Sequence, residues 1–135
     1  MPGIDECLSE AMAVPGARGA ALVDWSSGLA LGTAGDSPVG DHEVTAAETA
    51  ELARAAAEYE SFAPNGATDG EPPGADGPPL EDVIVTTRSG YHILRFVETS
   101  FDSSIFLHLW LDRDSGNLAL ARIRLRELAG ELVLR

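Results

Sequence analysis

The stretch Ile105-Phe106-Leu107-His108-Leu109-Trp110-Leu111 decides the fold, because its apolar residues alternate. Successive side chains of an extended strand point to opposite faces of a sheet, so the isoleucine and leucines share one face while Phe106, His108 and Trp110 share the other. Both faces are therefore largely apolar. This pattern predicts a central strand with helices covering the sheet on both sides.

Two further segments upstream carry strand signals. Val83 to Thr87 and Tyr91 to Val97 are rich in β-branched and aromatic residues, and Arg88-Ser89-Gly90 separates them as a turn. A second turn around Phe101-Asp102-Ser103 leads into the strand at 105–111. We therefore predict three consecutive antiparallel strands.

An earlier hairpin is predicted nearer the amino terminus. Ala20 to Trp25 and Leu29 to Gly32 are short apolar runs, separated by Ser26-Ser27-Gly28. Gly28 occupies a turn position that favours positive φ. The stretch from Thr33 to Glu43 is predicted to be a loop.

The first and last helices are predicted from apolar residues at helical spacing. The first covers residues 4–14 and ends at Pro15-Gly16. The last follows Asp114-Ser115-Gly116-Asn117, which offers capping residues. It includes Arg122 to Arg126, which alternates like a strand but has the composition of a helix. The predicted core stripes are Ile4, Cys7, Leu8, Ala11 and Met12 in the first helix, and Leu118, Ala121, Leu125, Leu128 and Leu132 in the last.

The second helix is predicted to begin at Thr45, which forms a capping box with Glu48, and to run to about Ser61. Its apolar side has two sectors on the helical wheel. One interpretation is that both sectors cover the domain's own sheet. The other is that the larger residues do so while the alanines let a second helix approach closely. The sectors are Leu52, Ala56 and Tyr59, and Ala46, Ala50, Ala53 and Ala57.

A Pro/Gly-rich insertion occupies about residues 63–80. It has five prolines and four glycines between Pro64 and Pro79, with three acidic residues among them. Such a segment buries too little apolar surface to offset the entropy of ordering, so we predict a mobile loop inside a single domain spanning 1–135.

Charge is distributed unevenly along the chain. Residues 1–82 carry 16 acidic residues against two arginines, whereas residues 83–135 carry six against seven, and the total is −13. An acidic surface repels phosphate, so neither a nucleic acid nor a membrane is expected as a partner. The lone cysteine and the lack of a signal-peptide pattern or a long apolar run predict a cytoplasmic protein.

The sequence offers few residues suited to catalysis or metal binding. If Glu98 pairs with Ser104, His92 and His108 lie diagonally on one sheet face, but two imidazoles fall short of the three or four ligands of a zinc site. The sequence has no phosphate-binding loop and no Gly-x-Ser-x-Gly or Cys-x-x-Cys motif, and Cys7 belongs to a core stripe. We therefore predict no catalytic residues, cofactor or metal, and thus no enzyme. A small enzyme that uses His92 or His108 as an acid or base remains an alternative.

The order of these elements resembles the Roadblock/LC7 family. Residues 13–24 (AVPGARGAALVD) and 27–31 (SGLAL) are similar to its opening, in which a helix ends in Pro-Gly before a hairpin. The alanine-rich second helix, Ser89-Gly90-Tyr91 and Gly116-Asn117-Leu118 are similar to later parts of the same family. The resemblance covers nearly the whole chain, apart from the Pro/Gly-rich insertion.

The resemblance implies an α+β fold, a profilin-like sandwich in the order α-β-β-α-β-β-β-α. Its five-stranded antiparallel sheet would have the second helix on one face and the other two on the opposite face. It also implies a homodimer through the second helix and third strand, and a small Ras-like GTPase as partner, activated or scaffolded by the dimer. A ligand-sensing module of PAS or GAF type is an alternative, and a pocket under the helices beside His92 and Trp110 would favour it. The expected dimer interface is Ala46, Ala50, Ala53, Ala57, Val83 and Val85.

Overall fold

A computed structural model describes residues 3–63, 80–98 and 104–133. These residues form three α-helices, one short 3-10 helix (η1) and five strands, in the order predicted from the sequence. The elements are α1 (Ile4–Met12), β1 (Ala17–Asp24), β2 (Leu29–Gly35), α2 (His42–Glu58), η1 (Glu60–Phe62), β3 (Asp82–Thr86), β4 (Gly90–Val97), β5 (Ile105–Asp112) and α3 (Leu118–Val133).

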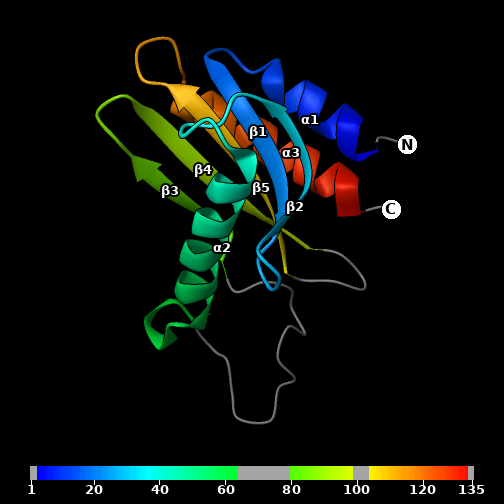
Figure 1. Ribbon diagram of the computed structural model, residues 1–135, viewed down its shortest axis with the longest axis vertical. Helices are drawn as coiled ribbons and strands as arrows, with labels where there is room; N and C mark the ends of the chain where they lie inside the picture. Colours follow the sequence, from blue (N-terminus) through cyan, green and yellow to red (C-terminus); the bar gives the residue numbers. More distant parts are fainter. Residues whose placement is uncertain (1–2, 64–79, 99–103, 134–135) are drawn as a thin grey trace.

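The five strands form one antiparallel sheet in the order β2-β1-β5-β4-β3 (Figure 1). β5 pairs with β1 on one side and β4 on the other, so the strand at 105–111 is central, as predicted. Its pairing with β4 places Val97 opposite Ile105 and His92 opposite Trp110. This is the register that a pairing of Glu98 with Ser104 would give, and it places His92 and His108 diagonally on one face of the sheet.

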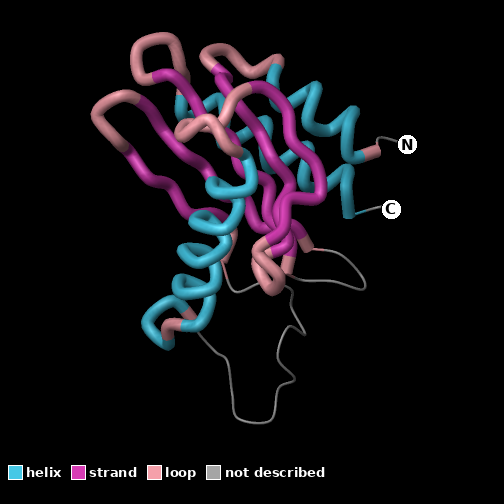
Figure 2. Tube along the Cα trace, in the orientation of Figure 1, coloured by secondary structure: helices cyan, strands magenta, loops and turns pink. Residues whose placement is uncertain are grey.

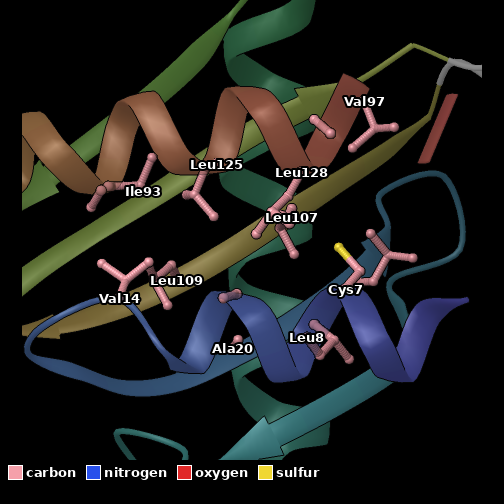
Figure 3. Close-up of a cluster of buried hydrophobic side chains, with 14 of the residues drawn as sticks. Cys7, Leu8, Val14, Ala20, Ile93, Val97, Leu107, Leu109, Leu125 and Leu128 are labelled. Atoms are coloured by element: carbon pink, nitrogen blue, oxygen red, sulfur yellow. The ribbon is translucent and has the colours of Figure 1, made fainter. Parts of the chain in front are cut away.

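Helices cover both faces of the sheet, as the two-sided strand predicted (Figure 2). α1 and α3 pack together on one face, where Leu107, Leu109 and Leu111 of β5 are buried and Ile105 is partly buried. Figure 3 shows the side chains of this layer, in which Leu107 and Leu109 of β5 lie among residues of α1 and α3. α2 lies on the other face over Phe106.

Two glycines shape the first hairpin and its cover. Gly28 has φ +79°, the positive value predicted for the turn between β1 and β2. In β2, a Cβ added at Gly32 would lie 2.6 Å from Ile4 Cγ2 and 3.0 Å from Leu8 Cδ1. The absence of a side chain at Gly32 is therefore what lets α1 lie close against the edge of the sheet.

The start of α2 differs from the prediction. The helix begins at His42, and the carboxylate of Asp41 caps it by accepting a hydrogen bond from the Glu43 amide at 2.9 Å. Thr45 lies inside the helix, with its hydroxyl 2.7 Å from that of Ser37. Asp41 caps the helix in place of Thr45, because aspartate is as good a capping residue as threonine. The helix therefore starts about a turn earlier than predicted. The predicted loop is correspondingly short, since β2 continues to Gly35.

α3 is helical throughout Arg122 to Arg126, which resolves the ambiguity in favour of helix. The side chain of Asn117 caps it by accepting from the Leu120 amide at 3.0 Å. Arg122 forms an ion pair with Asp82 of β3 at 2.7 Å. Arg124 forms an ion pair with Glu10 of α1 at 2.9 Å. The five predicted core residues of α3 all contribute to the same cluster.

Two predictions lie outside the described residues: most of the Pro/Gly-rich insertion and the turn at Phe101-Asp102-Ser103. In the described part of the chain, no helix has the length and apolar character needed to span a membrane.

Candidate functional site

The alanine seam of α2 packs on the chain's own sheet. Ala46, Ala50 and Ala53 are buried in one cluster with Phe96 and Phe106. The sheet supplies large aromatic side chains here, so the helix fits closely only where its own residues are small. The expectation that this seam faces a second helix is thus wrong for these three alanines, while Ala57 is half-buried.

The sector of α2 with larger residues is the one left uncovered. Leu52 and Tyr59 are exposed, although Ala56 is buried. The idea that the larger residues cover the sheet is therefore wrong for Leu52 and Tyr59. The helical wheel shows that both sectors of α2 are apolar. The large side chains of Phe96 and Phe106 on the sheet determine that the alanine sector faces inward.

A groove of about 280 Å³ lies between this uncovered side of α2 and strands β3 and β4. Its walls combine aliphatic side chains with hydroxyls, one carboxylate and one imidazole. The groove is lined by Pro38, Val39, Thr45, Glu48, Thr49, Leu52, Val85, Thr87, His92 and Leu94.

β3 forms the edge of the sheet beside this groove (Figure 1). Val83 packs against the cluster under α2, and Val85 lines the groove, so both valines of the expected interface lie on the α2 side of the edge strand. Both are partly exposed. No other described strand pairs with β3 beyond its contact with β4. The uncovered surface therefore combines the exposed flank of α2 with an unpaired strand edge.

His92, which lines this groove, contacts the buried His108. His92 Nδ1 and His108 Nε2 are 3.0 Å apart, and the rings stack at 5.2 Å. Trp110 stacks on His92, and the Arg18 guanidinium lies 4.0 Å from the centre of the indole ring. The hydrogen bond uses one nitrogen of each imidazole. Within the described residues, no group of three or more His, Cys, Asp and Glu side chains is placed to hold a metal ion.

Burial keeps both imidazoles neutral. Desolvation, followed by the proximity of His92 and His42, lowers the pKa of His108 to about 3. Desolvation also lowers the pKa of His92. Among the described residues, neither imidazole is hydrogen-bonded to a charged group that could activate it as a general acid or base. This arrangement favours a structural role.

The His108 pKa predicts how stability depends on pH. Between about pH 6.5 and 3 the unfolded chain binds a proton that the folded chain does not, so the free energy of unfolding falls as the pH falls. The slope is about 1.4 kcal/mol per pH unit for one group. We expect urea denaturation at pH 7, 6 and 5, at one protein concentration, to show this loss. His108→Leu should reduce the slope, and an unchanged slope would contradict this assignment.

The arginines near the sheet have different environments. Arg95 is largely covered, with Glu81 3.9 Å away. Arg113 donates to the Thr87 carbonyl at 2.9 Å and lies over the Tyr91 ring. Arg88 is exposed in the turn between β3 and β4. Arg88 and Arg113 are therefore both exposed to a partner, although Arg113 already contacts the Thr87 carbonyl and Tyr91.

Cys7 is buried in the core between α1 and the sheet, as predicted (Figure 3). Desolvation and the nearby Glu10 and Glu131 carboxylates raise its thiol pKa to about 11. The thiolate is therefore scarce at neutral pH, and Cys7 is a core residue rather than a nucleophile.

Several solved structures are similar to this chain, among them the following two. A Roadblock/LC7 domain from Streptomyces avermitilis has a TM-score of 0.70 at 17% sequence identity, covering 97% of this chain and 95% of that chain. MglB from Myxococcus xanthus has a TM-score of 0.67 at 18% identity, covering 96% of this chain and 81% of that chain. No protein-family model matches the sequence, and no curated protein matches it.

Proposed function

We propose that this chain, which has the Roadblock/LC7 fold, is a non-catalytic homodimeric platform that binds and regulates a small Ras-like GTPase. The observation that carries the proposal is the uncovered surface formed by Leu52, the groove and β3. It lies on the helix and strand through which the sequence resemblance implies dimerisation.

The dimer would join two β3 edges and so extend the sheet across both subunits. Pairing would satisfy backbone groups along the edge that no described strand satisfies within one chain. It would also bring the α2 helix of the second copy toward the groove, where Val39, Leu52 and Val85 offer apolar contacts. Ala46, Ala50 and Ala53 would support this interface from beneath, by holding α2 close to its own sheet.

Regulation of a GTPase by such a platform needs no chemistry from the platform. A protein that contacts the GTP-bound and GDP-bound forms with different affinity shifts the balance between them. The described residues support this passive role, because their one close pair of titratable imidazoles is neutral and mutually hydrogen-bonded. The acidic surface makes a partner with a basic contact face the most favourable one.

The test is to combine the protein with small GTPases encoded in the same genome, loaded with GDP or a non-hydrolysable GTP analogue. We expect at least one to bind with an affinity that depends on the nucleotide. Hydrolysis of GTP by that GTPase should change when the platform is added, while the platform alone should release no phosphate.

Outcomes that would contradict the proposal are clear. Phosphate release by the isolated chain would contradict the non-catalytic role. The absence of binding to any of the GTPases in either nucleotide state would remove the GTPase from the proposal. Arg88→Ala tests whether the platform inserts this arginine into the GTPase: unchanged stimulation would exclude Arg88 as an inserted arginine.

A second candidate is a ligand-sensing module of PAS or GAF type, favoured by the groove beside His92. Its volume of about 280 Å³ lies just below the roughly 300–1,000 Å³ of most small-molecule sites. The two functions make opposite demands on the groove, since the dimer fills it and a ligand needs it open. Perturbation of the His92 ring signals on dilution, with no ligand added, would favour the dimer.

A further inference from the structure

The edge of the sheet opposite β3 is formed by β2. Its one described strand neighbour is β1 (Figure 1). Asp36 N donates to Arg18 O at 2.9 Å, and the register pairs Ala34 with Ala20 and Gly35 with Gly19. Because an antiparallel strand alternates the direction of its backbone groups, the N–H and C=O of Thr33 and Gly35 point away from β1.

One of these outward groups is already used. The ring of His42, at the start of α2, lies with Nε2 3.0 Å from Gly35 O, and since a carbonyl only accepts, this nitrogen carries the proton. His42 therefore occupies the end of the edge, in the position that a neighbouring strand would otherwise take. The outward N–H and C=O of Thr33 come next along the strand.

β2 has few of the features that protect a free edge. Its sequence, LALGTAG, contains no charged residue and no proline, but the strand has a bulge at Leu31, the extra residue between Ala30 and Gly32, which pair with Val23 and Leu22 of β1. Leu29 and Leu31 are 65% and 45% exposed. The edge therefore presents apolar side chains together with outward backbone groups, the combination that binds an extended peptide.

Acidic side chains border this edge on both faces. On α2, Arg54 donates to the Trp25 carbonyl in the turn between β1 and β2, which orients that flank of the helix toward the hairpin. On α1, Glu10 pairs with Arg124 of α3, so the opposite flank faces outward over β2. We call the exposed acidic residues along this edge the acidic rim. They are Asp5 of α1, Asp36 directly after β2, and Glu43, Glu51 and Glu58 of α2.

We propose that β2 binds an extended, cationic segment of a partner protein as a sixth strand. The backbone of Thr33 supplies the strand hydrogen bonds, Leu29 and Leu31 contact apolar side chains of the segment, and the acidic rim attracts its lysines or arginines. A second copy of this chain is a poor occupant, because two acidic rims would face each other. The site lies at the opposite edge from the proposed dimer contact and does not depend on it.

The test uses a capped peptide of alternating lysine and valine as the probe. Its control alternates lysine and proline, and so has the same charge but cannot form a strand. We expect the lysine–valine peptide to bind at least about tenfold more tightly. Hydrogen exchange of the Thr33 amide should slow when it binds.

Two variants test whether the peptide binds at β2. Thr33→Pro removes one outward N–H but leaves the pairing with β1 intact, and should abolish the preference for the lysine–valine peptide, whereas Thr33→Val should retain it. Leu31→Lys should weaken binding without changing the backbone, and keeps the test decisive if Thr33→Pro fails to fold. Equal binding of both peptides, no effect of Thr33→Pro and Leu31→Lys, or protection at Val83 and Val85 instead would overturn the proposal.

Discussion

Ala53→Arg is expected to unfold the domain. Ala53 is 0% exposed and packs with Phe96 and Phe106 between α2 and the sheet. An arginine there has no described acidic partner, and burying an unpaired charge costs several kcal/mol, a large part of the roughly 5–15 kcal/mol that stabilises a domain. Circular dichroism should show the loss of a cooperative thermal transition at 25–90 °C.

Ala47→Arg is the matched control, because Ala47 is an exposed alanine of the same helix. It should melt close to the unchanged protein. If Ala53→Arg gave instead a folded monomer, the alanine seam would face a second copy rather than the sheet. The two outcomes therefore distinguish the observed packing from the interface expected from the sequence.

The sequence predicted the fold well because the deciding pattern is local and strong. Alternation in 105–111 determines which residues face each helix layer, and a central strand covered on both sides admits few other arrangements. The confirmed features include the order of elements, the antiparallel sheet and the distribution of helices. The resemblance to Roadblock/LC7 is likewise confirmed at the level of the fold.

The sequence predicted less about the faces of α2, for a physical reason. A helical wheel ranks residues by polarity, and both sectors of α2 are apolar. Which sector turns inward depends on the side chains it meets, and Phe96 and Phe106 come from distant strands. The start of α2 was wrong by about a turn because Asp41 and Thr45 are both capping residues.

The two sheet edges differ in chemistry as well as position. β3 carries Val83 and Val85 beside the groove and the exposed Leu52, whereas β2 is bordered by acidic side chains. An apolar edge suits a second copy of the same chain, and an acidic edge repels one. This difference predicts a dimer that closes at β3 and does not continue into a filament through β2.

Leu52→Glu is the prediction that tests this dimer. Leu52 is 40% exposed and lines the groove between α2 and β3, so in the proposed dimer it becomes covered by the second copy. A carboxylate at this position would be buried without a described basic partner, close to Glu48. We expect the dimer to weaken at least about a hundredfold, leaving a folded monomer by light scattering, because a truncated or charged contact at an interface centre costs on the order of 3 kcal/mol.

Val44→Glu is a closely matched control for Leu52→Glu. Val44 is an aliphatic residue of the same helix with a similar exposure of 43%, but it does not line the groove. The Val44→Glu protein should remain dimeric, which separates the effect of position from that of added negative charge. A monomeric wild type would refute the dimer itself, and a Leu52→Glu protein that stays dimeric would place the interface away from the groove.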